Sequence, residues 1–487
     1  MSGAVIFPSV EFALFFPLVL GLSWLLMPRP RLWKPFVLVA SYAFYMAASW
    51  KFGVLLGVVT LGNQLAAVLL ARTSGPRARK SIVALAVVLD LGVLAAFKYY
   101  GFFAQEINGV LGDFGLALSM PLVAIAIPLG VSFYVFQAIS YVVDVYRGVI
   151  ERGRTIDVAI YLSFFPHVVA GPIVRAREFL PQLERPRDPR EVAVGAAVVL
   201  IAVGLVKKVA IADTLAREVV DPVFAVPEAY AAPDVALAAY AYAVQIYCDF
   251  SGYTDIAIGV ALLMGFVFPQ NFRAPYRATS IREFWRRWHI TLSRYLRDFL
   301  YIPLGGNRGS TIRTYRNLMV TMLLGGLWHG ASWNYVLWGA YHGVLLIVAR
   351  AAGSLVPRTA QREGGWMRPL QIAGMFVLTL IGWLIFRETE LDHLWRDLRL
   401  TPATSTELDR STALYLFLLA ALYSLPLWIQ DIWAEAGGPN LAGAVDTPEA
   451  AVHWPRVAMQ ALVCGLMLAA VLTLRSSTAL NFIYFSF

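Results

Sequence analysis

Two histidines in tryptophan-rich segments are the residues best suited to acid–base chemistry. His289 stands in Trp-His-Ile-Thr-Leu-Ser, with arginines on both sides, and His329 stands in Leu-Trp-His-Gly-Ala-Ser-Trp, inside an apolar run long enough to enter a bilayer. A neutral imidazole, whose unperturbed pKa is about 6.5, is a competent general base toward a hydroxyl. Because an ionisable residue at membrane depth is costly to keep, its presence there favours a functional role.

Each histidine could instead have a purely structural role, in packing or at the membrane interface. For His329 we favour catalysis over packing, and for His289 a function over a merely interfacial position. His342 lies 13 positions beyond His329, at a different angle around one helix, so we expect it to form a packing hydrogen bond. We expect solvation in loops for two of the remaining histidines and hydrogen bonding in a broken segment for the third: His393, His453 and His167.

Other signatures of catalytic or metal sites are missing from the sequence. It contains no Walker loop, GxSxG elbow, HExxH or GxGxxG motif. The two cysteines, Cys248 and Cys464, both lie in apolar segments, so neither a disulfide framework nor a zinc site is indicated. We therefore expect no metal and no permanently bound cofactor.

The composition places these histidines in a membrane protein. Of the 487 residues, 59% are hydrophobic and only 15% are charged, and the mean hydropathy is +0.64. A soluble protein is about a quarter charged. The apolar runs are continuous rather than alternating, which predicts spanning helices and not a barrel. The sequence therefore predicts an all-α polytopic membrane protein.

The positive charge indicates membrane topology rather than nucleic-acid binding. The net charge is +9, and basic residues gather in the links at residues 29–34 and 72–80. Cytoplasmic loops collect lysine and arginine. We therefore expect both links in the cytoplasm and the N-terminus outside it.

The apolar runs predict roughly eleven or twelve transmembrane helices and re-entrant or interfacial pieces in a single domain, 1–487, with a catalytic core near 127–350. A re-entrant piece is expected at 162–173, where prolines and glycines interrupt the run, and an interfacial loop or short helix at 102–120. The predicted helices lie near residues 12–27, 35–49, 52–71, 81–97, 127–147, 192–212, 235–265, 331–350, 369–386, 413–430 and 457–474.

Two further segments carry polar groups that lipid would not tolerate. Residues 245–256 include Ser251 and Asp255, which should face a cavity or the protein interior. Residues 273–316 are rich in arginine and are predicted to lie on or dip into the cytoplasmic face. Arginines there could attract the phosphates of an acyl carrier, in addition to their usual positive-inside role.

Five long motifs closely resemble the membrane-bound O-acyltransferase family, and in particular its bacterial branch of alginate O-acetylation membrane subunits. Weaker similarity covers nearly the whole chain. One departure is His167, where the branch more often has glutamine. The matching stretches are Phe164–Ile173, Asp249–Asp255, Phe284–Ser293, Arg297–Arg308 and Gly326–Trp333.

The resemblance implies a fold, a reaction and roles for both histidines. His329 matches the family's near-invariant histidine, and His289 matches its second, more variable functional position. The fold implied is a ring of tilted helices around a thinned centre with a tunnel. The donor would be acetyl-CoA or a carrier thioester in the cytoplasm, and the acceptor a polysaccharide reached through a periplasmic partner. The residues we assign to substrate or donor binding are Trp285, Arg286, Arg287, Arg297, Asn307, Trp328, Asp255 and Ser251.

We therefore expect an inner-membrane O-acyltransferase, most simply an acetyltransferase for a secreted or cell-surface polysaccharide. A first alternative is transfer of D-alanine or another acyl group from a carrier protein to a cell-wall polymer or peptidoglycan. A second is a transporter or flippase of polymer precursors, although the sequence lacks the related halves that transporters often show. A third is a structural subunit that anchors a periplasmic transferase.

Overall fold

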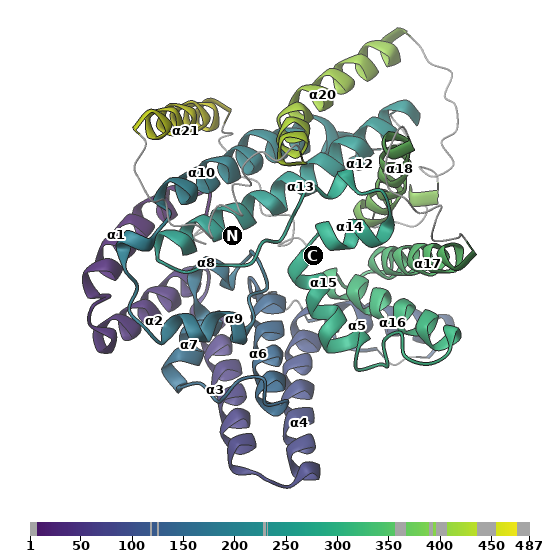
Figure 1. The fold of residues 1–487 in the computed structure, drawn as a ribbon. Coiled ribbons are helices and arrows are strands. Elements are labelled where there is room, and N and C mark those ends of the chain that lie inside the picture. Colours follow the sequence, from purple (N-terminus) through teal and green to yellow (C-terminus); the bar gives the residue numbers. More distant parts are fainter. Residues whose placement is uncertain are drawn as a thin grey trace. The chain divides into compact units, whose positions relative to one another are not determined.

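The computed structural model consists of helices and their connections (Figure 1). It describes residues 7–116, 119–123, 126–226, 230, 232–355, 367–388, 393–395, 407–435 and 454–474, and no strand occurs among them. Within the described residues, seven helices are long and apolar enough to cross a membrane, and three apolar helices are shorter. The prediction of an all-α, multi-pass membrane protein is confirmed.

The number of long apolar helices is smaller than the number of predicted spans because some of these spans form helices too short for a full crossing, such as the 17-residue Val10–Leu26. At 1.5 Å per residue this helix is about 25 Å long, less than a typical hydrocarbon core. The predicted interfacial segment at 102–120 begins as helix and continues the stretch Pro76–Asp113, where a π-helical turn at Ala95–Tyr99 links two α-helices.

The chain divides into two compact units, residues 1–197 with 257–269 and residues 198–256 with 270–487. Helix α10 (Val194–Leu205) begins in the first unit and α13 (Ala232–Leu263) ends in it. The other helices of the first unit are α1 (Val10–Leu26), α2 (Pro30–Met46), α3 (Trp50–Arg72), α4 (Pro76–Leu94), α5 (Tyr100–Asp113), α6 (Val131–Tyr146), α7 (Thr155–Ser163), α8 (Phe165–Val168) and α9 (Ala176–Phe179).

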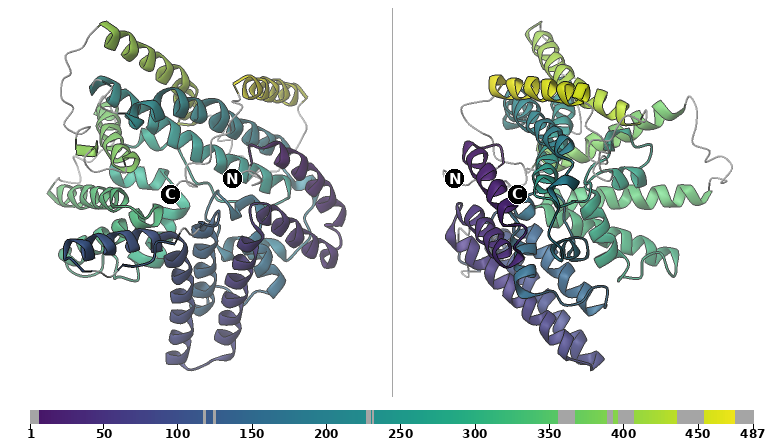
Figure 2. Two further views of the ribbon diagram at one scale, coloured as in Figure 1. Left: turned by 180° about the vertical axis from the view of Figure 1, so that it is seen from behind. Right: turned by 60° about the vertical axis from the view of Figure 1, so that its left-hand side comes forward.

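The first unit is organised around α6, which packs against both α3 and α4 and is almost entirely buried. Helices α3 and α4 lie side by side as an antiparallel hairpin (Figure 2). Proline stands in the first turn of α4, where its missing N–H costs nothing. After α8 the chain is non-helical and buried as far as Arg175, so the predicted broken segment is present. There His167 Nε2 lies 2.8 Å from the Tyr161 carbonyl oxygen, the hydrogen bond that we expected.

The second unit holds both candidate catalytic histidines. Helix α10 continues through π-helical turns into α11 (Asp213–Leu215) and α12 (Asp221–Ala225). The remaining helices of the second unit are α14 (Ile281–Arg287), α15 (Ile290–Leu296), α16 (Thr311–His329), α17 (Trp333–Leu355), α18 (Met367–Arg387), α20 (Glu407–Glu435) and α21 (Trp454–Leu474). Helices α16 and α17 pack closely as neighbours, and this pairing sets the position of His329 at the end of α16.

Candidate active site

His289 lies at a sharp break between two short helices. Helix α14 is capped by Ser280, whose hydroxyl accepts from the Glu283 backbone N–H, and it ends at Arg287. His289 then adopts φ +41°, in the left-handed region that residues with a β-carbon seldom occupy. The arginine-rich segment is thus not one continuous amphipathic helix. Strained residues of this kind tend to occur where a side chain must be aimed for function.

The hydrogen bonds of His289 define its tautomer. Asn271 Oδ1 accepts from the Thr291 backbone N–H at 3.2 Å and from the Thr291 hydroxyl at 2.9 Å, so this atom is the amide oxygen. The His289 Nδ1–H therefore donates to the same oxygen at 3.1 Å. The lone pair then lies on Nε2, which has no hydrogen-bond partner among the described residues.

His289 is fully buried, which argues against a solvated interfacial position. Burial lowers the pKa of its imidazole from 6.5 to about 3. The ring therefore stays neutral at physiological pH, and Nε2 acts as a hydrogen-bond acceptor. Asn271 was not predicted, because no spacing rule connects it with a histidine 18 positions away.

His329 is the last residue of α16 and is 3% exposed. Its imidazole lies in an aromatic enclosure: the ring centroids of Trp338 and Phe386 are 5.0 and 5.3 Å away, nearly perpendicular to it. These rings come from α17 and α18. The enclosure keeps the imidazole in surroundings of low polarity, where electrostatic interactions are stronger than in water.

One indole lies between the two predicted catalytic histidines. The ring centroid of Trp328 is 6.0 Å from that of His289 and 5.0 Å from that of His329. The structure thus brings both histidines to the same tryptophan from positions 40 residues apart in the sequence. Trp328, one of the predicted binding residues, is the side chain that both of them contact.

The expectation for His342 was wrong in its geometry. It assumed one helix through His329 and His342, but α16 ends at His329 and α17 begins at Trp333. The His342 ring lies 4.6 Å from Trp338 and 5.2 Å from Trp285, so it belongs to the same aromatic enclosure. Its Nδ1 is buried and has no hydrogen-bond partner in the described part of the chain.

The other predicted binding residues fall into separate groups. Trp285 belongs to the enclosure, since its ring centroid is 5.6 Å from that of Trp338. Arg286 and Asn307 are exposed at the surface. Arg287 pairs with Glu283 at 2.7 Å, and Arg297, with a side chain 59% exposed, pairs with Asp298 at 2.7 Å.

Asp255 and Ser251 are on α13, inside the protein as predicted. Asp255 forms an ion pair of 2.8 Å with Lys207, and the adjacent Lys208 pairs with Asp213 and Asp249 at 2.7 Å each. The Ser251 hydroxyl is buried and has no hydrogen-bond partner among the described residues. Ion pairs with α13 explain how two lysines are retained in an apolar helical stretch.

The described residues contain no group of three or more His, Cys, Asp or Glu side chains that could hold a metal ion.

Comparison with known proteins identifies the family. The family model for MBOAT, the membrane-bound O-acyltransferase family, matches residues 145–387, a range that contains every histidine of the enclosure. A probable alginate O-acetylase AlgI of Azotobacter vinelandii is 39% identical over 98% of this chain and 99% of its own length. The chain belongs to the membrane-bound O-acyltransferase family. It is a multi-pass membrane O-acyltransferase, as the five motifs indicated.

Two further relatives of this O-acyltransferase cover most of the chain. A probable alginate O-acetylase AlgI of Pseudomonas putida is 40% identical over 98% of this chain and 99% of its own length. A peptidoglycan O-acetyltransferase of Helicobacter pylori is 33% identical over 76% of this chain and 73% of its own length. Both relatives are named for the acetylation of a glycan polymer.

Proposed function

We propose that this enzyme moves an acetyl group from a cytoplasmic thioester toward a secreted or cell-surface polysaccharide, with His329 as the general base. The observation that carries the proposal is the placement of His289 and His329 on one buried tryptophan inside an aromatic enclosure. The relatives are named as a probable alginate O-acetylase and a peptidoglycan O-acetyltransferase, and these names support acetyl as the group and a glycan as the acceptor.

In the proposed reaction, His329 takes the proton of the acceptor hydroxyl as its oxygen attacks the thioester carbonyl carbon. The C–S bond then breaks, and the imidazolium returns the proton to the departing sulfur. The C-terminal end of α16 carries partial negative charge, which stabilises positive charge developing on the His329 ring. The surrounding rings keep water from competing with the acceptor hydroxyl.

His289 has a different role in this proposal. Because Nδ1–H donates to Asn271, the ring presents only an acceptor at Nε2. It therefore orients a donor group, either the attacking hydroxyl or an amide N–H of the thioester arm. Its low pKa makes His289 a poor proton acceptor, which leaves proton abstraction to His329.

The proposed donor is acetyl-CoA or a carrier protein bearing the acetyl thioester, received on the cytoplasmic side. The exposed Arg286 and Arg297 would bind its phosphates. Arg297 keeps 59% of its side chain exposed beside Asp298, whereas Arg287, paired with Glu283, keeps only 18%. We further propose a place in the bacterial inner membrane, an N-terminus outside the cytoplasm, and a periplasmic partner that completes the transfer. The basic link between α3 and α4 supports this orientation.

The test is release of free CoA thiol from acetyl-CoA by purified protein in detergent. We expect His329→Ala to lower the rate by at least a hundredfold, the contribution typical of a general base. His393→Ala is the control, since the His393 side chain is 26% exposed and lies 3.9 Å from Glu388, whereas His329 is buried, and this variant should keep the wild-type rate. Equal release by wild type and His329→Ala would contradict the role of His329.

The same assay separates the alternative donors. Release by the wild type establishes acetyl-CoA as a substrate. If neither protein releases thiol, an acyl carrier protein loaded with acetate or D-alanine is offered in its place. Transfer from that carrier by the wild type alone would favour the carrier-dependent alternative and retain His329 as the base.

A further inference from the structure

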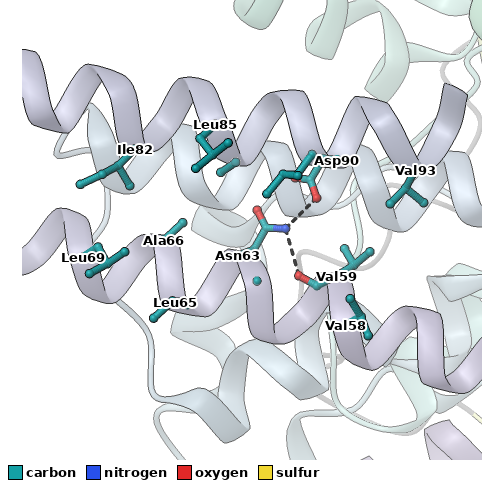
Figure 3. Close-up of a pocket in the computed structure, with 13 residues that line it drawn as sticks. Val58, Val59, Asn63, Leu65, Ala66, Leu69, Ile82, Leu85, Asp90 and Val93 are labelled. Carbon is teal, nitrogen blue, oxygen red and sulfur yellow. Dashed lines mark hydrogen bonds between the residues drawn. The ribbon is translucent and has the colours of Figure 1, made fainter. Parts of the chain in front are cut away.

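The hairpin of α3 and α4 contains an apolar groove far in sequence from the catalytic histidines (Figure 3). Its volume is about 340 Å³, and both helices line it. Val58, Leu65, Leu85 and Leu89 are each about 60% exposed, so the groove opens on the outer surface of the hairpin. Both helices belong to stretches that are long and apolar enough to cross a membrane, so an opening between their exposed valines and leucines suits an apolar ligand.

A polar pair lies inside this groove. Asn63 Nδ2 donates to Asp90 Oδ1 at 2.8 Å and to the Val59 carbonyl oxygen at 3.0 Å, as Figure 3 shows. The two residues are 2% and 3% exposed. Asp90 Oδ2 and Asn63 Oδ1 have no hydrogen-bond partner in the described part of the chain. Two buried oxygens without a partner in an apolar setting are costly, unless a bound group satisfies them.

Small residues keep the groove open beside this pair. A β-carbon added to Gly62 would meet no atom within 4 Å, and Ala66 and Ala86 line the groove further along. The residues that line the groove extend along both helices, from Val58 to Leu69 and from Ile82 to Val93. A helix about 10 Å across would lie over the rims and could not enter it, whereas a hydrocarbon chain fits between them.

The turn at one end of the hairpin is basic. Arg72, Arg77 and Lys80 are exposed there, with no acidic partner among the described residues. Asn63 precedes Arg72 by nine positions, which corresponds to about 13 Å along α3. A hydrocarbon chain whose anionic head binds at this turn would thus place the middle of the hydrocarbon chain beside Asn63 and Asp90.

We propose that this groove binds an anionic long-chain amphiphile that carries a hydroxyl group near the middle of its chain. The acid head pairs with the basic turn, the chain fills the groove, and the hydroxyl meets Asp90 and Asn63. A hydroxyl both donates and accepts, so it pairs with Asp90 whether or not the carboxyl is protonated. This site is independent of the proposed acyl transfer.

The test compares two probes, 12-hydroxyoctadecanoate and octadecanoate, binding to the purified full-length protein in detergent, followed by native mass spectrometry. We expect the hydroxy acid to bind about tenfold more tightly, as a hydrogen bond to a charged group would provide. The double variant Asn63→Leu, Asp90→Leu should bind both acids equally. Gly62→Leu, which fills the groove, should lose both.

Gly21→Leu is the matched control, because Gly21 on α1 also has open space around it but lies outside the groove. It should bind both acids as the wild type does, and size-exclusion elution shows that each variant is folded. Equal binding of the two acids by the wild type would overturn the proposal. So would binding of neither acid, or a preference for the hydroxy acid that survives in the double variant.

Discussion

At the scale of single residues, one amide determines what His289 can do. Asn271 Oδ1 accepts three hydrogen bonds, two from Thr291 and one from His289. The two bonds from Thr291 identify the acceptor atom, and this atom in turn fixes the histidine proton on Nδ1. The acceptor character of His289 Nε2 is therefore imposed by Asn271 through the opposite ring nitrogen.

This dependence predicts the effect of Asn271→Leu. The variant frees His289 to take either tautomer and orientation, so we expect thiol release from the acyl thioester to fall about tenfold, chiefly in kcat. Thr291→Val is the control, because it removes one hydroxyl and leaves the histidine bond in place. The altered tautomer should appear in the ¹⁵N spectrum of imidazole-labelled protein. A wild-type rate with a changed spectrum would show that the tautomer is irrelevant to catalysis.

At the scale of elements, α10 and α13 cross through two glycines. A β-carbon on Gly204 would lie 2.6 Å from the Gly252 carbonyl oxygen, and one on Gly252 would lie 2.7 Å from the Gly204 carbonyl oxygen. Such close backbone approach is typical of helix packing within membranes. Just beyond Gly204, Lys207 and Lys208 lie on a π-helical turn and pair with carboxylates of α13. The glycines thus bring the backbones together, and the ion pairs fix the register.

We expect Gly204→Val to destabilise the protein by about 1–3 kcal/mol, because its side chain would push apart two backbones that cannot yield. Gly21→Val changes the same residue type within a helix where the space is open, and it should leave stability within about 0.5 kcal/mol of the wild type. Thermal unfolding in detergent, followed by intrinsic tryptophan fluorescence, measures both. Similar losses in the two variants would indicate that β-branching within a helix, and not the crossing, is responsible.

At the scale of the whole molecule, the sequence was sufficient for some features and not for others. Apolar runs predicted most helices, because hydropathy alone decides what enters lipid. The motif around His329 was recognisable, but the sequence could not show that His289 meets it at Trp328, since that contact depends on how α14 breaks. The error for His342 arose from reading two helices as one. Asn271 and Phe386 left no sequence signal, because ring contacts and single amides have no periodicity.

A stability prediction for the whole protein follows from two buried histidines, one in each unit. Burial lowers the pKa of His289 to about 3 and that of His167 to about 4. In the unfolded chain both titrate near 6.5, so only the unfolded state gains protons between pH 6.5 and about 4. Their contribution to stability is therefore complete above pH 6.5 and declines as the pH falls, by ~1.4 kcal/mol per unit for each histidine.

We thus expect the unfolding temperature in detergent to be constant between pH 7 and 8 and to drop steeply below pH 6. In the double variant His167→Gln, His289→Gln the slope below pH 6 should flatten, since glutamine does not titrate, even if the variant starts from a lower unfolding temperature. A slope that persists in the double variant would place the acid sensitivity on other groups. Agreement would show that both units hold a neutral histidine in their interior, the state in which His289 can accept a hydrogen bond at Nε2.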